Sequence, residues 1–176
     1  MLRFLERRKY ICITLVVFLA NCFFDRLTKY LAVRFLKGER PIRLLHDLIV
    51  VRYTENNGAF LSLGADWNGY VKYLVLLILP ALVCFAGLFY LMFKENSVKR
   101  IILISSIIGG GLSNLADRLF NDFKVIDFLN FGIGGIRTGI LNVADLSVTF
   151  GIILLMINEL IITGKNRAGD QDIEKD

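Results

Sequence analysis

The sequence is poor in the side chains that bind transition metals or carry thiol redox chemistry. His46 is the only histidine, and the three cysteines, Cys12, Cys22 and Cys84, lie inside apolar stretches without a Cys-x-x-Cys pair. Zinc sites and thiol redox sites both need closely spaced ligands of these types. We therefore expect neither a metal nor a cofactor, and we interpret the cysteines as small buried apolar side chains.

Charge is missing from long parts of the chain. Hydrophobic residues make up 55% of the 176 positions. A helix needs roughly 20 residues to cross the ~30 Å hydrocarbon layer of a bilayer, and four uncharged apolar blocks approach that length. The sequence therefore predicts a single integral membrane domain, residues 1–165, and a disordered cytoplasmic tail, residues 166–176. The four transmembrane helices are expected at about residues 10–30, 73–93, 101–120 and 142–162.

Basic residues dominate the charge, and the net charge is +5. Many of them flank the apolar blocks, so the expected partner is membrane lipid and not nucleic acid. The triplet Gly109-Gly110-Gly111 lacks the lysine and the spacing of a phosphate-binding loop. We expect these small residues to allow close helix packing in the membrane. Pro80 is expected to bend the second span.

The segment between the first two spans differs from the rest. Residues 40–44 and 48–53 are rich in β-branched and apolar side chains, and Glu55-Asn56-Asn57-Gly58 is a turn signal. A small sheet cannot lie exposed to lipid. The predicted fold is thus an all-α membrane protein of four transmembrane helices, with a small extracytoplasmic β-rich cradle between spans 1 and 2.

Three carboxylates, Asp117, Asp127 and Asp145, fall within 29 residues between two uncharged runs. A charged side chain inside a bilayer costs roughly 2.5–3.5 kcal/mol at full depth, so these three need a function. Two opposed carboxylates can share a proton and activate water. We predict that Asp127, in a loop of about twenty residues after the third span, and Asp145 form such a catalytic pair.

Successive spans alternate in direction, so the polar ends of all four meet on one side of the membrane. Asp25, the turn at Asn56 and the three later aspartates all lie on that side. The basic residues divide ten to eleven between the two sides, but seven of the ten are concentrated in residues 3–9 and 94–100. This density predicts cytoplasmic termini and an active site near the outer face.

Five short motifs in order give the chain its resemblance to the bacterial lipoprotein signal peptidases (signal peptidase II). They are D-R-L-T-K at Asp25–Lys29, N-N-G-A-F at Asn56–Phe60, S-N-L-A-D-R at Ser113–Arg118, V-I-D-F at Val125–Phe128 and L-N-V-A-D at Leu141–Asp145. Each motif alone is weak, but all five in sequence are specific. The match extends from about Tyr10 to Ile162.

The resemblance implies a multi-pass aspartic endopeptidase of the cytoplasmic (inner) membrane, and we expect the protein to be a monomer. Its substrate would be a prolipoprotein with an S-diacylglyceryl cysteine, cut just before that cysteine. The catalytic pair would be Asp127 and Asp145. Residues implied to support the site or the substrate are Asp25, Lys29, Asn56, Gly58, Asn114, Arg118, Asn142 and Ala144. Two positions depart from the family pattern, Arg26 and Phe60, and they put local packing in question more than chemistry.

Several roles stay open at this point. Asp25 and Lys29 form either an ion pair that caps the end of the first helix or a support for the site. Arg118 either neutralises Asp117 or fixes the loop that carries Asp127, and for Asp117 we favour a structural ion pair over catalysis. Asn56 and Asn142 are candidates to donate hydrogen bonds to the substrate backbone or to the ionised carboxylate.

Two other functions would use some of the same residues. In a small transporter, carboxylates at the membrane edge would relay protons, but these carboxylates gather at one end and no repeat is present. A serine–lysine peptidase using Ser62 or Ser113 with Lys29 would leave Asp127 and Asp145 without a role.

Overall fold

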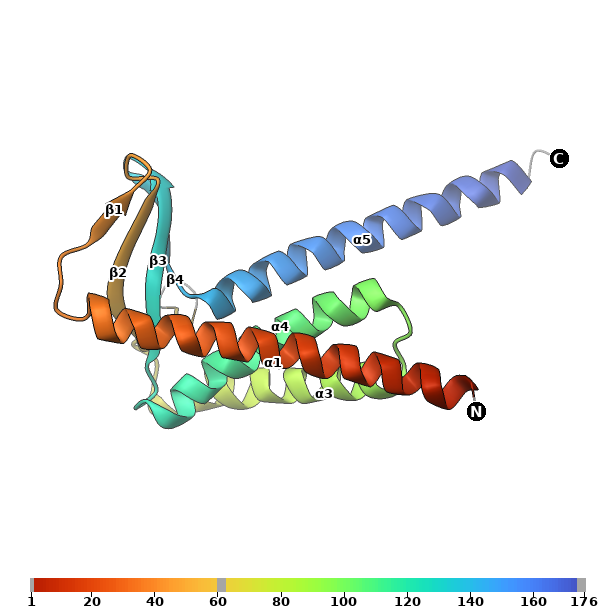
Figure 1. Ribbon diagram of the computed structural model, residues 1–176, viewed down its shortest axis with the longest axis horizontal. Coiled ribbons are helices and arrows are strands. Elements are labelled where there is room, and N and C mark those ends of the chain that lie inside the picture. The colour runs from red at the N-terminus through yellow and green to blue at the C-terminus, as the bar shows by residue number, and fades with distance from the viewer. Residues whose placement is uncertain (1, 60–62, 174–176) are drawn as a thin grey trace.

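Four long helices make up most of the molecule. The computed structural model describes residues 2–59 and 63–173 (Figure 1). The helices are α1 (Leu2–Leu36), α2 (Gly69–Tyr73) continuing through the π-helical segment η2 (Leu74–Ile78) into α3 (Leu79–Phe93), α4 (Val98–Phe120) and α5 (Val143–Ile173). The parts long and apolar enough to cross a membrane are Arg7–Leu36, Gly69–Phe93, Val98–Phe120 and Val143–Lys165. The structure thus has four candidate spans where the sequence predicts them, and each is longer than predicted.

The last helix extends beyond the point at which the sequence predicts a disordered tail. α5 continues to Ile173, whereas the tail was expected to begin at residue 166. Residues 166–173 contain no proline and one glycine, Gly169, so little in them interrupts helical hydrogen bonding. The helix boundary therefore lies later than expected. Residues 174–176 of the expected tail lie outside the described residues.

The second span changes helix type next to its proline. The π-helical segment η2 ends at Ile78, two residues before Pro80. A proline ring has no N–H to donate and crowds the carbonyl group four residues earlier, here that of Leu76. A π-helical turn relieves such crowding by widening the helix. The sequence predicts a bend at Pro80, and the structure has a π-helical segment just before this proline.

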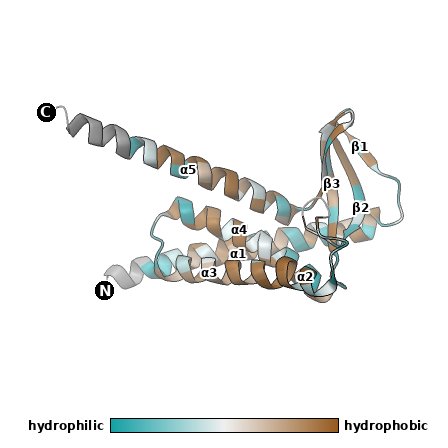
Figure 2. Cartoon of the chain, turned by 180° about the vertical axis from the view of Figure 1, so that it is seen from behind, coloured by the Kyte–Doolittle hydropathy of each residue, from teal (hydrophilic) through white to brown (hydrophobic). Residues whose placement is uncertain are grey.

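Helix α4 lies at the centre of the bundle and packs against the other spans. A methyl group added to Gly110 would lie 2.5 Å from the carbonyl oxygen of Ala144 on α5, and one added to Gly109 would lie 2.8 Å from Cβ of Asn21 on α1. Glycine at these two positions therefore lets three backbones approach closely, as the small-residue pattern predicts. Figure 2 shows hydrophobic residues along α3 and along the middle of α5.

A four-stranded antiparallel sheet stands at one end of the helices, opposite the two termini (Figure 1). Its order is β1 (Ile42–Leu44), β2 (Ile49–Asn56), β3 (Val125–Ile133) and β4 (Ile136–Leu141). The sequence prediction of a cradle built only between spans 1 and 2, within an all-α protein, is thus wrong in part. Strands β3 and β4 come from the segment after α4, which the sequence predicts as a loop. That prediction rested on its glycines, which are typical of loops, and two of them, Gly134 and Gly135, form the turn between the strands.

The two faces of the sheet have different surroundings. On one face, Phe128 is buried with Ala32 and Leu36 at the end of α1, and Val51 and Tyr53 pack against them. Side chains alternate along a strand, so the residues between these point to the opposite face. That opposite face carries Asp127 of β3, which pairs with Thr54 of β2. The apolar face thus fixes the sheet to α1 and leaves Asp127 on the polar side.

Candidate active site

Asp127 is a buried carboxylate held by two amides. Its side chain is 2% exposed. Asn56 Nδ2 donates to Asp127 Oδ2 at 2.9 Å, and Asn142 Nδ2 donates to Asp127 Oδ1 at 2.7 Å. The Asn56 amide is fixed in this orientation because the N–H of Gly58 donates to its oxygen at 2.9 Å. The Asn142 amide is fixed in the same way by the N–H of Asp145, at 2.8 Å.

Asp145 lies in the first turn of α5 and forms a reciprocal cap with Asn142. Asn142 directly precedes the helix and accepts a hydrogen bond from Asp145 N, while Asn142 N donates to Asp145 Oδ2 at 3.1 Å. The other oxygen, Oδ1, accepts from Asn114 Nδ2 of α4 at 2.8 Å. The helix N-terminus also favours a negative charge here. Local capping chemistry therefore sets the position of this carboxylate.

Asn142 brings the two carboxyl groups together, because its side chain contacts Asp127 and its N–H contacts Asp145. Burial raises the pKa of Asp127 from its ordinary value of 3.8 to about 6. The hydrogen bonds from Asn56 and Asn142 oppose this rise, and the charge of Asp145 adds to it. Asp127 thus takes up or releases a proton close to neutral pH, as a general acid–base group requires.

A buried lysine organises the residues behind this pair. Lys29, Asp25 and Asp117 are each no more than 1% exposed. Lys29 Nζ lies 2.7 Å from Asp25 Oδ2 and 2.7 Å from Asp117 Oδ2, and it donates to Asn114 Oδ1 at 2.9 Å. Because the Asn114 oxygen faces the lysine, its Nδ2 must face Asp145. The cation therefore fixes the amide that holds the second catalytic candidate.

Asp25 joins three helices through the same network. Its Oδ1 accepts from Ala144 N in the first turn of α5 at 2.9 Å, and its Oδ2 accepts from Ser113 Oγ of α4. The Asp25–Lys29 ion pair exists, but it does not cap the end of its helix, because α1 continues to Leu36. Of the two alternatives, the structure favours support of the site.

Arg118 does not pair with Asp117, which corrects one of the sequence-based alternatives. Its Nη2 donates to the carbonyl oxygen of Gly58 at 2.6 Å and its Nη1 to that of Asn114 at 3.2 Å. Asp117 instead lies 2.7 Å from Arg26 Nη1, in addition to its contact with Lys29. Consecutive residues of a helix do not face each other, so neighbouring positions on α4 reach different partners. Arg118 therefore fixes the turn that orients Asn56.

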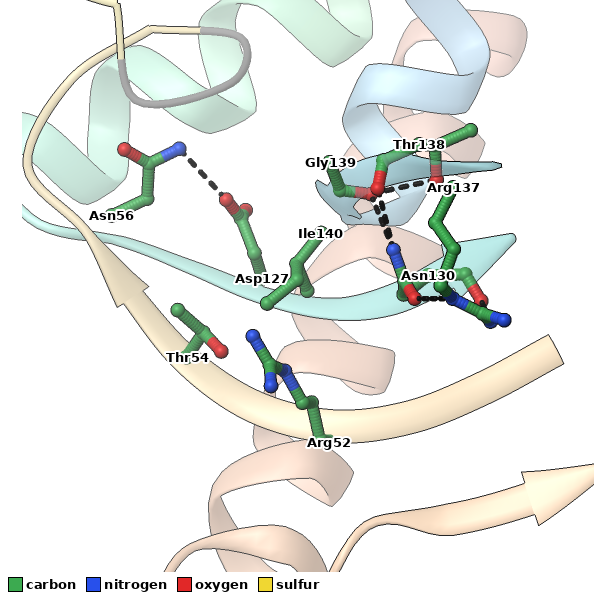
Figure 3. A pocket seen from close by; sticks show the side chains of 9 residues that line it. All are labelled: Arg52, Thr54, Asn56, Asp127, Asn130, Arg137, Thr138, Gly139 and Ile140. Carbon is green, nitrogen blue, oxygen red and sulfur yellow. Dashed lines mark hydrogen bonds between the residues drawn. The ribbon is translucent and has the colours of Figure 1, made fainter. Parts of the chain in front are cut away.

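Two cavities border the pair of carboxylates. The first, of about 430 Å³, opens on the polar face of the sheet, and Figure 3 shows Asp127 on its wall. The second, of about 220 Å³, lies between the helices and has Asp145 on its wall. Its other lining residues are mostly small or apolar: Ala59, Leu76, Pro80, Gly111, Asn114, Leu115, Arg118, Val148 and Thr149. The carboxyl groups thus separate a polar space from a largely apolar one.

All ten candidate site residues lie in one connected set of hydrogen bonds and ion pairs. They are Asp25, Lys29, Asn56, Gly58, Asn114, Arg118, Asp127, Asn142, Ala144 and Asp145. Sequence reasoning missed Arg26 and Ser113 as members of this set. Asp117 was the signal for Arg26, because a carboxylate on a membrane helix needs a cationic partner.

The serine–lysine alternative does not fit the contacts. The Ser113 hydroxyl donates to Asp25, and the three contacts of Lys29 Nζ are all with oxygen acceptors, so the lysine is a bound cation and no base. Ser62 lies outside the described residues. Within residues 2–59 and 63–173, no group of three or more His, Cys, Asp or Glu side chains is placed to hold a metal ion.

Comparison with known proteins gives a consistent result over nearly the whole chain. The family model described as signal peptidase (SPase) II matches residues 17–161. The lipoprotein signal peptidase of Borrelia hermsii (strain HS1 / DAH) is 32% identical over 171 residues, which cover 94% of this chain and 98% of that one. The lipoprotein signal peptidase of Borreliella burgdorferi (strain ZS7) is 33% identical over 156 residues, covering 85% and 91%.

The fold is also found among solved structures. One, described as a bacterial membrane enzyme, superposes with a TM-score of 0.75 at 25% identity, over 86% of this chain and 90% of that chain. A second, described in the same words, gives a TM-score of 0.72 at 24% identity, over 84% and 92%. The arrangement of four spans and a terminal sheet is therefore shared with membrane enzymes.

Proposed function

The chain belongs to the signal peptidase II family and so removes signal peptides from prolipoproteins, and we propose that it does this as an aspartic-type peptidase with Asp127 and Asp145 as the catalytic pair. The observation that supports this most is the double contact of Asn142 with the two carboxyl groups. A pair of carboxyl groups held against one residue can share a proton as an aspartic protease requires.

The reaction uses one ionised and one protonated carboxyl group. The ionised group takes a proton from a water molecule as the water oxygen attacks the scissile carbonyl carbon, and the protonated group gives its proton to the carbonyl oxygen. The tetrahedral diol then collapses. One hydroxyl proton returns to a carboxylate, the C–N bond breaks, and the departing nitrogen takes the proton held by the other carboxyl group. Asn56 and Asn142 stabilise Asp127 whenever it is ionised.

The substrate cysteine carries an S-diacylglyceryl group in this proposal, and cleavage occurs just before it. The 220 Å³ cavity supports this, since Leu76, Leu115 and Val148 line it beside Asp145. A thioether-linked glyceryl group with acyl chains needs an apolar space that is continuous with lipid. Apolar side chains exposed on the helices, such as Leu82 and Leu154, provide the lipid-facing surface.

The enzyme lies in the bacterial cytoplasmic membrane as one peptidase domain, residues 1–165, with the sheet on the outer surface. Two features support this orientation. Basic residues gather at the end opposite the sheet, in Arg7–Lys9 and Lys94–Arg100, as is typical of cytoplasmic connections. The unpaired edges of β1 and β4 need water or headgroups as hydrogen-bond partners.

The catalytic assignment is tested with Asp127→Asn and Asp145→Asn in detergent, using a diacylglyceryl-modified prolipoprotein and its unmodified form. We expect each variant to fold and to lose cleavage by at least about 10³-fold, because an amide can neither accept the proton of water nor donate a shared one. Asp122→Asn is a matched control, since Asp122 is exposed in the loop before β3. Substantial turnover by either dyad variant would refute the pair, and equal cleavage of both substrates would refute the lipid requirement.

The orientation is tested with reporter fusions. We expect fusions at Lys165 and Asn96 to report the cytoplasm and a fusion at Asn68 to report the outer side, because four spans return the chain to its starting side. A fusion with the opposite result would overturn the proposed topology while leaving the catalytic pair intact.

A further inference from the structure

The polar cavity on the sheet is built like a binding site for part of the substrate. Arg52, Thr54 and Asn56 alternate along β2 and line it from one side, and Asp127 lines it from β3 (Figure 3). Its volume of about 430 Å³ falls within the roughly 300–1,000 Å³ of ligand pockets. The scissile bond must lie near Asp127, so whatever occupies this cavity is close to the reaction.

The cavity contains one cationic side chain without a partner. Within residues 2–59 and 63–173, no hydrogen bond or ion pair involves the Arg52 guanidinium, and this side chain is exposed. Arg137, the other cation of the cavity, is occupied. Its nitrogens donate to Oδ1 and the carbonyl oxygen of Asn130 and to the carbonyl oxygen of Asp47. Figure 3 shows Arg52 directed from β2 toward the strand that carries Asp127.

The position of the cavity selects the part of the substrate that enters it. A signal peptide is apolar and remains in the bilayer, whereas the sheet has open edges that cannot face lipid. The chain that leaves the membrane at the active site is therefore the segment that follows the scissile bond. This step rests on the proposed catalytic pair, because it takes Asp127 as the place of cleavage.

We propose that Arg52 binds an acidic side chain of the substrate at the second or third residue after the scissile bond. Arg52 lies two residues from Thr54, which pairs with Asp127, and a strand rises about 3.3 Å per residue, so the guanidinium is about two substrate residues from the reaction. A guanidinium matches a carboxylate with two parallel hydrogen bonds. Arg52 thus determines specificity for the mature end of the substrate.

The test uses the purified full-length protein in vesicles of zwitterionic lipid. The substrates are diacylglyceryl-modified prolipoproteins that differ only in Asp or Asn at the second or third position after the bond. We expect kcat/KM to favour Asp by about fivefold at one of these positions, as an exposed charge-assisted pair allows, and we expect the preference to shrink in high salt.

Two variants make the test specific. Arg52→Gln should abolish the preference for Asp, and Arg52→Glu should reverse it, so that a Lys substrate is cut faster than an Asp substrate. Arg43→Gln is the matched control, because Arg43 lies on β1 of the same sheet and pairs at the surface with Asp47. It should keep the wild-type preference.

The outcomes separate this inference from the proposed catalytic pair. If the wild type cuts the Asp and Asn substrates equally at both positions while Asp127→Asn is inactive, the Arg52 inference is wrong and the catalytic pair stands. If Asp127→Asn cuts normally, the pair itself fails. A loss of activity in Arg52→Gln that appears only in anionic vesicles, with no substrate preference, would assign Arg52 to a lipid headgroup and overturn the inference.

Discussion

The two ends of the helical bundle are each held together by charged side chains, but these side chains are buried at one end and partly exposed at the other. At the sheet end, Lys29 with its two aspartates is almost inaccessible to water. At the opposite end, Arg100 of α4 binds Glu159 of α5 at 2.6 Å, and these side chains are 30% and 44% exposed. Solvent screens the second pair and not the first.

The partners of the buried acids differ as well. Glu95, between α3 and α4, receives hydrogen bonds from Tyr90 Oη at 2.7 Å and from the N–H groups of Asn96 and Ser97 at 2.8 and 2.7 Å, so its main partners are local. Asp25 and Asp117 share one lysine, and Asp117 also contacts Arg26. Loss of this lysine therefore removes two buried ion pairs at the site end, whereas loss of Arg100 leaves Glu95 with its three local hydrogen bonds.

The largest effect should come from Lys29→Met. It leaves two buried carboxylates without their shared cation, which costs on the order of 3–5 kcal/mol of unfolding free energy, and it frees Asn114 to rotate away from Asp145. Cleavage should therefore fall by more than the folded fraction does, as measured by thermal unfolding and kcat in detergent. Asp117→Asn, which leaves the Asp25–Lys29 pair, should be milder in both measurements. Lys37→Met, which removes an exposed cation at 3.4 Å from Glu55, is the control, and its unfolding midpoint should stay near that of wild type.

The stability of the protein should depend on pH through Asp127 at the sheet end. Because the pKa of Asp127 rises from 3.8 to about 6 on folding, the native state holds this proton where the unfolded state has lost it. Stability is thus lost as pH rises from about 4 to 6, by roughly 3 kcal/mol. The difference in unfolding midpoint between Asp127→Asn and wild type should grow over this range. A difference that does not vary with pH would contradict the assignment.

Glu95 should respond in the opposite direction. Burial alone would raise its pKa, but the hydrogen bonds from the Tyr90 hydroxyl and the Ser97 and Asn96 N–H groups outweigh burial and lower its pKa below the ordinary 4.5. Its contribution to stability is therefore present at neutral pH and lost as pH falls through the folded-state pKa. Glu95→Gln should remove that loss in acid and leave the behaviour between pH 4.5 and 6 unchanged, as thermal unfolding at several pH values would reveal.

The smallest effect should come from the exposed pair at the same end. Arg100→Gln breaks the contact with Glu159, but both side chains are then solvated, so we expect the unfolding midpoint to stay within about 2 °C of wild type and cleavage to be unchanged. A shift as large as that of Lys29→Met would show that the two ends are not as different as their burial indicates.

The sequence predicted the parts of this molecule that depend on local pattern. Long uncharged blocks indicate membrane spans. Spans that alternate in direction bring the aspartates to one end, so the residues alone predicted both features. The motif Leu141–Asp145 also contains the reciprocal cap, since Asn142 and Asp145 have the spacing it needs. These features depend on neighbours within a few residues.

What the sequence did not predict depends on partners far along the chain. Strand β3 pairs with β2, which precedes it by a complete helical hairpin, and β4 pairs with β3. Asp117 was matched with its neighbour Arg118, but its partners Arg26 and Lys29 belong to another helix. Periodicity shows which face a residue occupies, but it does not show which distant residue the folded backbone places opposite that face.

The site can form only late in synthesis, because its residues lie far apart in the sequence. Asn56 and Asp127 are 71 residues apart, and Asp25 reaches Ala144 across 119 residues, beside the second catalytic candidate. A nascent chain with only three inserted helices therefore lacks Asp145, and the proposed catalytic pair is incomplete. We therefore expect proteolytic activity only after α5 has been synthesised and inserted into the membrane. Incomplete translation products should not cleave other proteins that are being secreted.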